Sequence, residues 1–129
     1  MPPNRKLIAV IDDDTSVRKA LDRQITAAGY RCHAFMSAEQ FLSVIALCDA
    51  AAVVCDIHLG GMTGLDLAVH PTVTQMKLPV VLISGSCDPS IEEPAGVVGA
   101  AFLRKPIAPG KLLEILVDTV GPPIADGED

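Results

Sequence analysis

The sequence predicts an α/β protein built on a doubly wound, five-stranded parallel sheet. Three observations support this fold class. Apolar runs of strand length recur along the chain without polar alternation, as in strands that are buried on both faces. Segments with apolar residues at helical spacing alternate with these runs. Several runs also end on a polar side chain, and open sheets of this class bind ligands at the carboxyl ends of their strands.

The first half of the chain contains three of the expected strands. Residues 7–11 are all apolar, and residues 15–28 follow with one apolar helical face. Residues 31–35 are typical of a shorter strand, and residues 37–40 (Ser-Ala-Glu-Gln) resemble a capping box that opens the next helix. Residues 51–56 form the third strand, which ends on a single carboxylate.

The second half contains two more strands. Residues 80–83 are fully apolar, and residues 100–104 form the last strand before a helix over residues 111–120. A helix that opens near Thr63 is expected to be a poor one, because Pro71 interrupts it.

Five strands that alternate with helices need cover on both faces of the sheet. We therefore expect the flavodoxin-like strand order 2-1-3-4-5. The fourth helix is an exception to the regular pattern. Residues 88–99 contain Pro94, Gly96 and Gly99, and these residues favour a short or distorted helix.

The length of 129 residues predicts one domain over residues 1–120, followed by a disordered acidic tail over residues 121–129. The formal charge of −6 argues against a nucleic-acid-binding surface. No segment reaches the roughly 18 apolar residues of a membrane span. The start of the chain lacks the apolar stretch of an export signal, and its cysteines lack metal-ligand spacing. We therefore expect a cytoplasmic protein that binds neither DNA nor membranes directly.

Polar side chains follow four of the five expected strands. They are Asp12, Asp13 and Asp14 after the first strand, Asp56 at the end of the third, Ser84 after the fourth and Lys105 after the fifth. In the expected strand order these four strands are neighbours, so the side chains should converge on one edge of the sheet. Asp14 is best placed to cap the helix that follows it.

Carboxylates held close together repel one another, so such a site favours a cation. Oxygen-only ligands suit Mg²⁺, which keeps several waters and is completed by a phosphate. Together with Lys105 and the Ser84 hydroxyl, the ion would neutralise charge on a transferring phosphoryl group. An aspartate in such a site can be the covalent acceptor.

These motifs resemble the receiver domain of two-component response regulators. The matching segments are residues 10–14 (Val-Ile-Asp-Asp-Asp), Asp56 with Met62 and Gly64, residues 83–85 (Ile-Ser-Gly) and residues 102–106 (Phe-Leu-Arg-Lys-Pro). The resemblance covers about residues 5–120. Within the family, residues 37–42 (Ser-Ala-Glu-Gln-Phe-Leu) are similar to the branch that regulates nitrogen fixation.

The resemblance implies a phosphorylation-switched signalling module. Asp56 would accept a phosphoryl group from a phosphohistidine of a histidine kinase or a histidine phosphotransfer protein. The Mg²⁺ ligands that it implies are Asp12, Asp13, Asp56 and the main-chain carbonyl of His58, with Asp12 acting largely through water. No enzymatic activity is implied beyond self-catalysed phosphotransfer and autodephosphorylation.

The resemblance also implies a switch. Ser84 would bond to the phosphoryl oxygens and shift toward them, and Lys105 would pair with the phosphate. Phe102 would change rotamer as Ser84 moves. Gly60 stands where the family usually has proline, beside Gly61, which predicts a more mobile loop after Asp56.

The expected partners follow from the same resemblance. The chain is too short to hold a DNA-binding output domain, so we expect output through a downstream protein that the sequence does not identify, or a role as a phosphoryl sink. The apolar residues of the last helix leave a homodimer open.

Two alternative functions remain open at this point. A haloacid-dehalogenase-like phosphatase would use Asp12 as its nucleophile and leave Asp56 without a task. A degenerate receiver would act only as a protein-binding module. Labelling with acetyl phosphate distinguishes the phosphatase from the receiver, because the phosphatase predicts label on Asp12 and the receiver predicts label on Asp56.

Overall fold

The computed structural model describes residues 5–85, 101–108 and 110–124. The strands are β1 (Leu7–Ile11), β2 (Arg31–Phe35), β3 (Ala50–Asp56), β4 (Val80–Ser84) and β5 (Ala101–Arg104). The helices are α1 (Thr15–Ala27), α2 (Ala38–Cys48), α3 (Gly64–Ala68), α4 (Pro71–Gln75) and α6 (Lys111–Val120). All strand pairs are parallel, in the order β2-β1-β3-β4-β5. The predicted fold class and strand order are confirmed.

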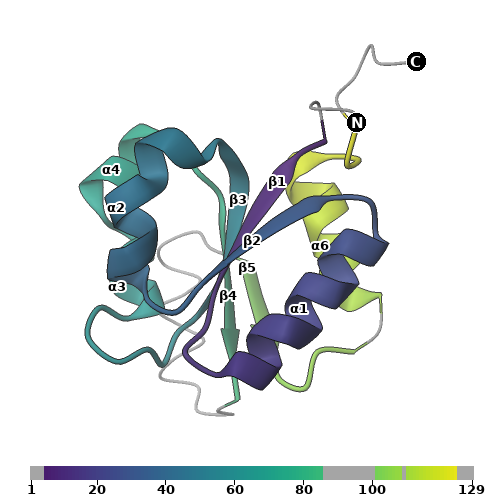
Figure 1. Ribbon diagram of the computed structural model, residues 1–129, viewed down its shortest axis with the longest axis horizontal. Coiled ribbons are helices and arrows are strands. Elements are labelled where there is room, and N and C mark those ends of the chain that lie inside the picture. Colours follow the sequence, from purple (N-terminus) through teal and green to yellow (C-terminus); the bar gives the residue numbers. More distant parts are fainter. Residues whose placement is uncertain (1–4, 86–100, 109, 125–129) are drawn as a thin grey trace.

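The sheet is the middle of three layers (Figure 1). Helices α1 and α6 cover one face, and α2, α3 and α4 cover the other. No helix within the described residues is both long and apolar enough to cross a membrane.

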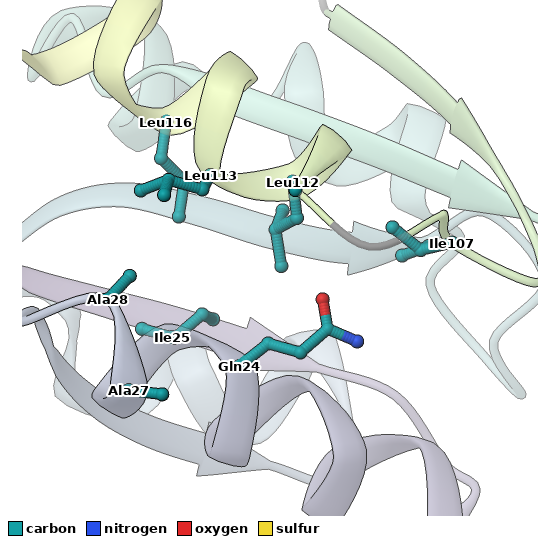
Figure 2. A pocket seen from close by; sticks show the side chains of 9 residues that line it. Gln24, Ile25, Ala27, Ala28, Ile107, Leu112, Leu113 and Leu116 are labelled. Carbon is teal, nitrogen blue, oxygen red and sulfur yellow. The ribbon is translucent and has the colours of Figure 1, made fainter.

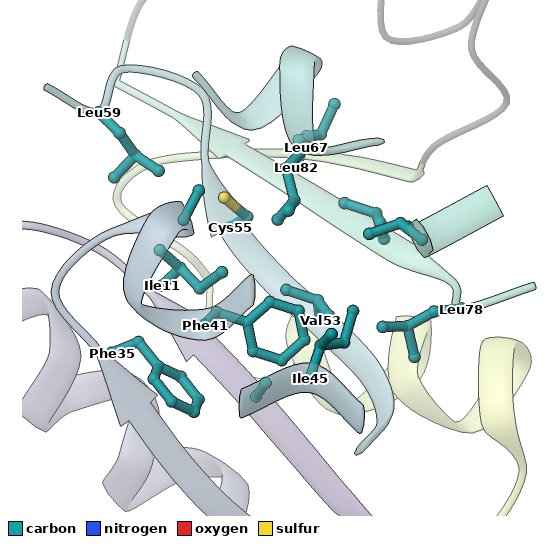
Figure 3. Packing of buried hydrophobic residues seen from close by; sticks show 14 of the residues in the cluster. Ile11, Phe35, Phe41, Ile45, Val53, Cys55, Leu59, Leu67, Leu78 and Leu82 are labelled. Atoms are coloured by element: carbon teal, nitrogen blue, oxygen red, sulfur yellow. The ribbon is translucent and has the colours of Figure 1, made fainter. Parts of the chain in front are cut away.

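Side chains from alternate strand positions build two apolar cores, one on each face of the sheet. On the α2 face, Val53 and Cys55 of β3 pack with Phe41 and Ile45 of α2 (Figure 3). On the α1–α6 face, Ala52 and Val54 of β3 pack with residues of the two helices that cover it. These β3 side chains are completely buried. The central strand is therefore apolar on both faces, as its sequence predicts.

The register of the strands brings the predicted polar side chains to one level. Ile11 of β1 pairs with Cys55 of β3, so Asp12 and Asp56 each lie one residue beyond this pair. Asp56 in turn pairs with Ile83 of β4. The carboxylates of Asp12 and Asp56 therefore lie side by side at the carboxyl ends of neighbouring strands.

Helix starts follow their predicted caps. The Asp14 side chain caps α1 by accepting from the N–H groups of Ser16 and Val17. At the start of α2, Ser37 Oγ accepts the Gln40 N–H, but the Gln40 side chain accepts the Met36 N–H and not that of Ser37, so the predicted capping box is only half formed. Thr63 begins α3 as part of a reciprocal capping box.

The predicted helix near Thr63 differs from expectation, because the structure forms two short helices in its place. Pro71 lacks the N–H that would continue α3 and instead occupies the first turn of α4. The His70 ring caps this second helix by accepting from the Thr72 N–H, 3.2 Å away. The predicted short or distorted helix over residues 88–99 lies outside the described residues.

The segment after α6 contacts the start of the chain. Lys6 N–H donates to the Pro123 carbonyl at 2.7 Å, and the Tyr30 hydroxyl donates to the Gly121 carbonyl at 2.7 Å. Arg5 and Ile124 form an antiparallel bridge. Residues 121–124, the start of the predicted disordered tail (residues 121–129), thus make defined contacts with the rest of the domain. Residues 125–129 lie outside the described part, so disorder there stays a prediction.

Gly64 links the fold to the end of β3. A Cβ atom at this position would lie 2.7 Å from the Asp56 carbonyl oxygen and 3.0 Å from both Ile57 Cα and Leu82 Cδ2. Two of these three atoms belong to the backbone, which cannot avoid an added methyl group by changing rotamer as a side chain can.

We predict that Gly64→Ala destabilises the protein by about 2 kcal/mol, because the added methyl group overpacks a closed site. Urea denaturation measures the change. Gly60→Ala is the matched control, since a Cβ at Gly60 meets nothing within 4 Å. Equal stability of the two variants would contradict the prediction.

Candidate functional site

A lysine ammonium group lies between two buried carboxylates at the carboxyl edge of the sheet. Lys105 Nζ is 3.0 Å from Asp12 Oδ2 and 2.8 Å from Asp56 Oδ2. Asp12 is completely buried, Asp56 is 5% exposed, and the Lys105 side chain is 25% exposed. These residues come from the ends of β1, β3 and β5, as the strand order predicts.

The second oxygen of each carboxylate accepts a main-chain N–H. Asp14 N–H donates to Asp12 Oδ1, and His58 N–H donates to Asp56 Oδ1, each at 2.9 Å. Both donors lie two residues after the carboxylate that they bind. Each acidic side chain is thus fixed by the turn that follows its own strand.

Burial dominates the electrostatics of Asp12. Desolvation raises the pKa of its carboxyl group and the neighbouring Asp56 charge raises it further, against the lowering effects of the Asp14 N–H and Lys105. Burial alone would lower the pKa of Lys105, but its bonds to Asp56 and Asp12 outweigh burial and raise that pKa. One ammonium therefore compensates two carboxylates, which leaves the site with an excess of negative charge.

Asp13 adds a third carboxylate to this group. Carboxylate oxygens of Asp12, Asp13 and Asp56 all lie within 4.8 Å of one another. Asp13 is exposed, whereas the other two are buried. An ion held by these hard oxygen donors would therefore keep one side open to water, which fits the preference of Mg²⁺ for partial hydration.

Ser84 and Phe102 lie near the same edge, on the two neighbouring strands. Ser84 ends β4 and is completely buried, and its carbonyl accepts the Lys105 N–H at 2.8 Å. Phe102 is partly buried and packs against the core on the α2 face. Ser84 thus lies on β4, the strand beside that of Asp56, and Phe102 lies on β5, one strand further out. The Lys105–Pro106 peptide bond is cis.

Two charged residues near the site were not predicted from the sequence. The Arg18 guanidinium donates to the Asp12 carbonyl at 2.6 Å and to Thr15 Oγ1 at 2.9 Å. Glu39 Oε2 accepts the Met62 N–H at 2.9 Å. The position of Arg18 one turn after the acidic run was a usable signal, whereas nothing local connects Glu39 with a residue 23 positions later.

A groove between α1 and α6 is separate from this acidic cluster. Its volume is about 380 Å³, and its walls are apolar apart from the Gln24 side chain (Figure 2). Ile25 and Ala28 line one side, and Leu112 and Leu116 line the other. No titratable side chain is among the residues that line this groove.

Comparison with known proteins gives one family. Residues 8–117 match the response regulator receiver domain. The sensory/regulatory protein RpfC of Xanthomonas campestris pv. campestris is 37% identical over 114 residues, which are 84% of this chain and 16% of RpfC. The transcriptional regulatory protein FixJ of Bradyrhizobium diazoefficiens is 28% identical over 114 residues, which are 88% of this chain and 56% of FixJ.

Solved structures agree with this assignment. A response regulator receiver protein from Burkholderia phymatum has a TM-score of 0.80 at 26% identity, over 96% of this chain and 100% of that chain. The chain spans less than two thirds of the length of RpfC and FixJ. The family match covers most of the residues, and the strand order and acidic cluster are those that the sequence resemblance implied. The chain therefore belongs to the response regulator receiver domain family.

Proposed function

We propose that this receiver domain is a phosphorylation-switched signalling module whose phosphoacceptor is Asp56. The observation that carries the proposal is the position of the Asp56 carboxylate, 2.8 Å from the Lys105 ammonium and within the acidic cluster. The donor would be a phosphohistidine of a histidine kinase or of a histidine phosphotransfer protein, in keeping with the family. We place this exchange in the cytoplasm.

The proposed transfer is a substitution at phosphorus. An Asp56 carboxylate oxygen forms a bond to phosphorus as the bond to the donor imidazole nitrogen breaks. The electron pair of that bond stays with the nitrogen, which takes up a proton from solvent. The His58 N–H holds one Asp56 oxygen in place, and Lys105 supplies positive charge beside the other.

Mg²⁺ is the cofactor that fits the acidic cluster. We assign it to the carboxylates of Asp12, Asp13 and Asp56 and to the main-chain carbonyl of His58, with Asp12 acting largely through water. When bound, the ion supplies positive charge that neutralises the phosphoryl oxygens. The excess negative charge of the three carboxylates over the one lysine supports this assignment.

Ser84 and Phe102 are the proposed switch. The Ser84 hydroxyl would bond to a phosphoryl oxygen, and the shift of Ser84 would change the packing of Phe102. Ser84 is joined to Lys105 through a main-chain hydrogen bond, so both residues can respond to the same group. Output would then pass to a downstream protein through the surface that Phe102 borders.

We predict that treatment with acetyl phosphate and Mg²⁺ places a phosphoryl group on Asp56, because among the described residues this carboxylate alone is both aligned by a following N–H and at the end of the central strand. Mass spectrometry of proteolytic fragments locates the adduct. Asp56→Asn should abolish it. Label that remains in Asp56→Asn and disappears in Asp12→Asn would contradict the proposal and favour a phosphatase with Asp12 as nucleophile.

We also predict that Asp12→Asn stabilises the metal-free protein by about 1 kcal/mol, because it removes a buried charge while Lys105 keeps Asp56 as its partner. Urea denaturation in the presence of a chelator measures this change. Asp14→Asn is the matched control, since Asn and Asp are equally good N-caps. A loss of stability in Asp12→Asn would show that the cluster is compensated without a metal ion.

A further inference from the structure

The loop between β3 and α3, residues 57–63, carries two groups of the proposed site. These are the His58 N–H, which binds Asp56, and the His58 carbonyl, which we assign to the metal. The loop is anchored at its beginning by the buried side chains of Ile57 and Leu59. It is anchored at its end by the capping box of Thr63 and Asp66.

The middle of the loop has little to hold it. Gly60 and Gly61 are adjacent and exposed, so the sequence predicts mobility there. Within residues 5–85, 101–108 and 110–124, the hydrogen bond that holds this middle part is the one from the Met62 N–H to Glu39 Oε2, at 2.9 Å. Glu39 lies in the first turn of α2, on a different element.

The start of α2 leaves the Glu39 carboxylate available for this contact. Ser37 Oγ accepts the Gln40 N–H, and Gln40 Oε1 accepts the Met36 N–H at 2.8 Å. Neither of these two capping bonds uses the side chain of Glu39. The bond from Met62 also lowers the pKa of Glu39, so the carboxylate is ionised at neutral pH.

The loop is shaped to receive this carboxylate. Gly61 has a φ of +78°, which favours glycine, and a Cβ there would lie 2.8 Å from Glu39 Oε2. A side chain at position 61 would therefore displace the carboxylate as well as strain the backbone. The glycine that loosens the loop is also the residue that lets Glu39 approach its main chain.

We propose that Glu39 is a positioning residue that fixes the β3–α3 loop, and through it His58, for metal binding and phosphoryl transfer at Asp56. Glu39 stands in for the stiffness that proline would give at position 60. This proposal rests on the function proposed above, since it assigns His58 to the metal site.

The test uses Glu39→Ala in the full chain, with Gln40→Ala as a control that weakens the α2 cap but leaves the loop contact. Glu39→Ala should speed exchange of the Met62 amide hydrogen at least about tenfold in the metal-free protein. It should weaken Mg²⁺ binding, measured by calorimetry, by roughly three- to tenfold, which is below the effect of removing a buried outer-shell partner. Gln40→Ala should change neither quantity.

A rescue variant separates positioning from charge. Gly60 has no positive φ, a Cβ there meets nothing within 4 Å, and its N–H donates to no partner among the described residues, so proline there removes no hydrogen bond and its Cβ meets no neighbour. Gly60→Pro in the Glu39→Ala background should restore most of the Mg²⁺ affinity. A double variant as weak as Glu39→Ala would assign the effect to charge and overturn the proposal.

Three further outcomes would count against one of the two proposals. Unchanged Met62 exchange and Mg²⁺ affinity in Glu39→Ala would overturn the positioning role, as would equal losses in Gln40→Ala. A wild-type protein that neither binds Mg²⁺ nor takes up a phosphoryl group would instead refute the proposed function. Met62 exchange in the metal-free protein would still report whether Glu39 fixes the loop.

Discussion

The structure depends on one interaction, the ammonium of Lys105 between the buried carboxylates of Asp12 and Asp56. Each of these groups is costly to bury alone, and one cation cannot offset two anions and the adjoining Asp13. The main-chain N–H groups of the following turns reduce the cost without cancelling it. The carboxylates at this edge of the sheet therefore keep a net negative charge that attracts a cation. A phosphoryl-transfer site needs this property.

The parallel sheet determines which face each functional side chain meets. Alternation along the strands puts Asp12, Asp56 and Lys105 in phase with residues that face α1 and α6, such as Val10, Val54 and Leu103. Ser84 and Phe102 are in phase with the α2 face, where Leu82 and part of Phe102 pack. The charged cluster and the proposed switch residues thus lie at one edge of the sheet, on strands whose apolar residues pack against both helical layers.

The strands and most of the acidic cluster could be predicted, because short contiguous segments of the sequence determine them. Apolar runs that end on Asp12, Asp56 and Ser84 carry both the strand and the polar group that it delivers. The division of the predicted third helix at Pro71 was harder, because proline can either end one helix or begin the next. The contact of Glu39 could not be predicted, since it joins two elements whose relative position comes from tertiary packing.

The central claim is that the three carboxylates form one cation site, and calorimetric titration of the wild-type protein with Mg²⁺ tests it most directly. The account predicts a single ion per chain, bound in a manner that requires both Asp13 and Asp56. Asp13→Asn and Asp56→Asn should each weaken binding, while Asp22→Asn, an acid on α1 outside the acidic cluster, should not. Binding that is absent, or that survives the loss of both Asp13 and Asp56, would contradict the account.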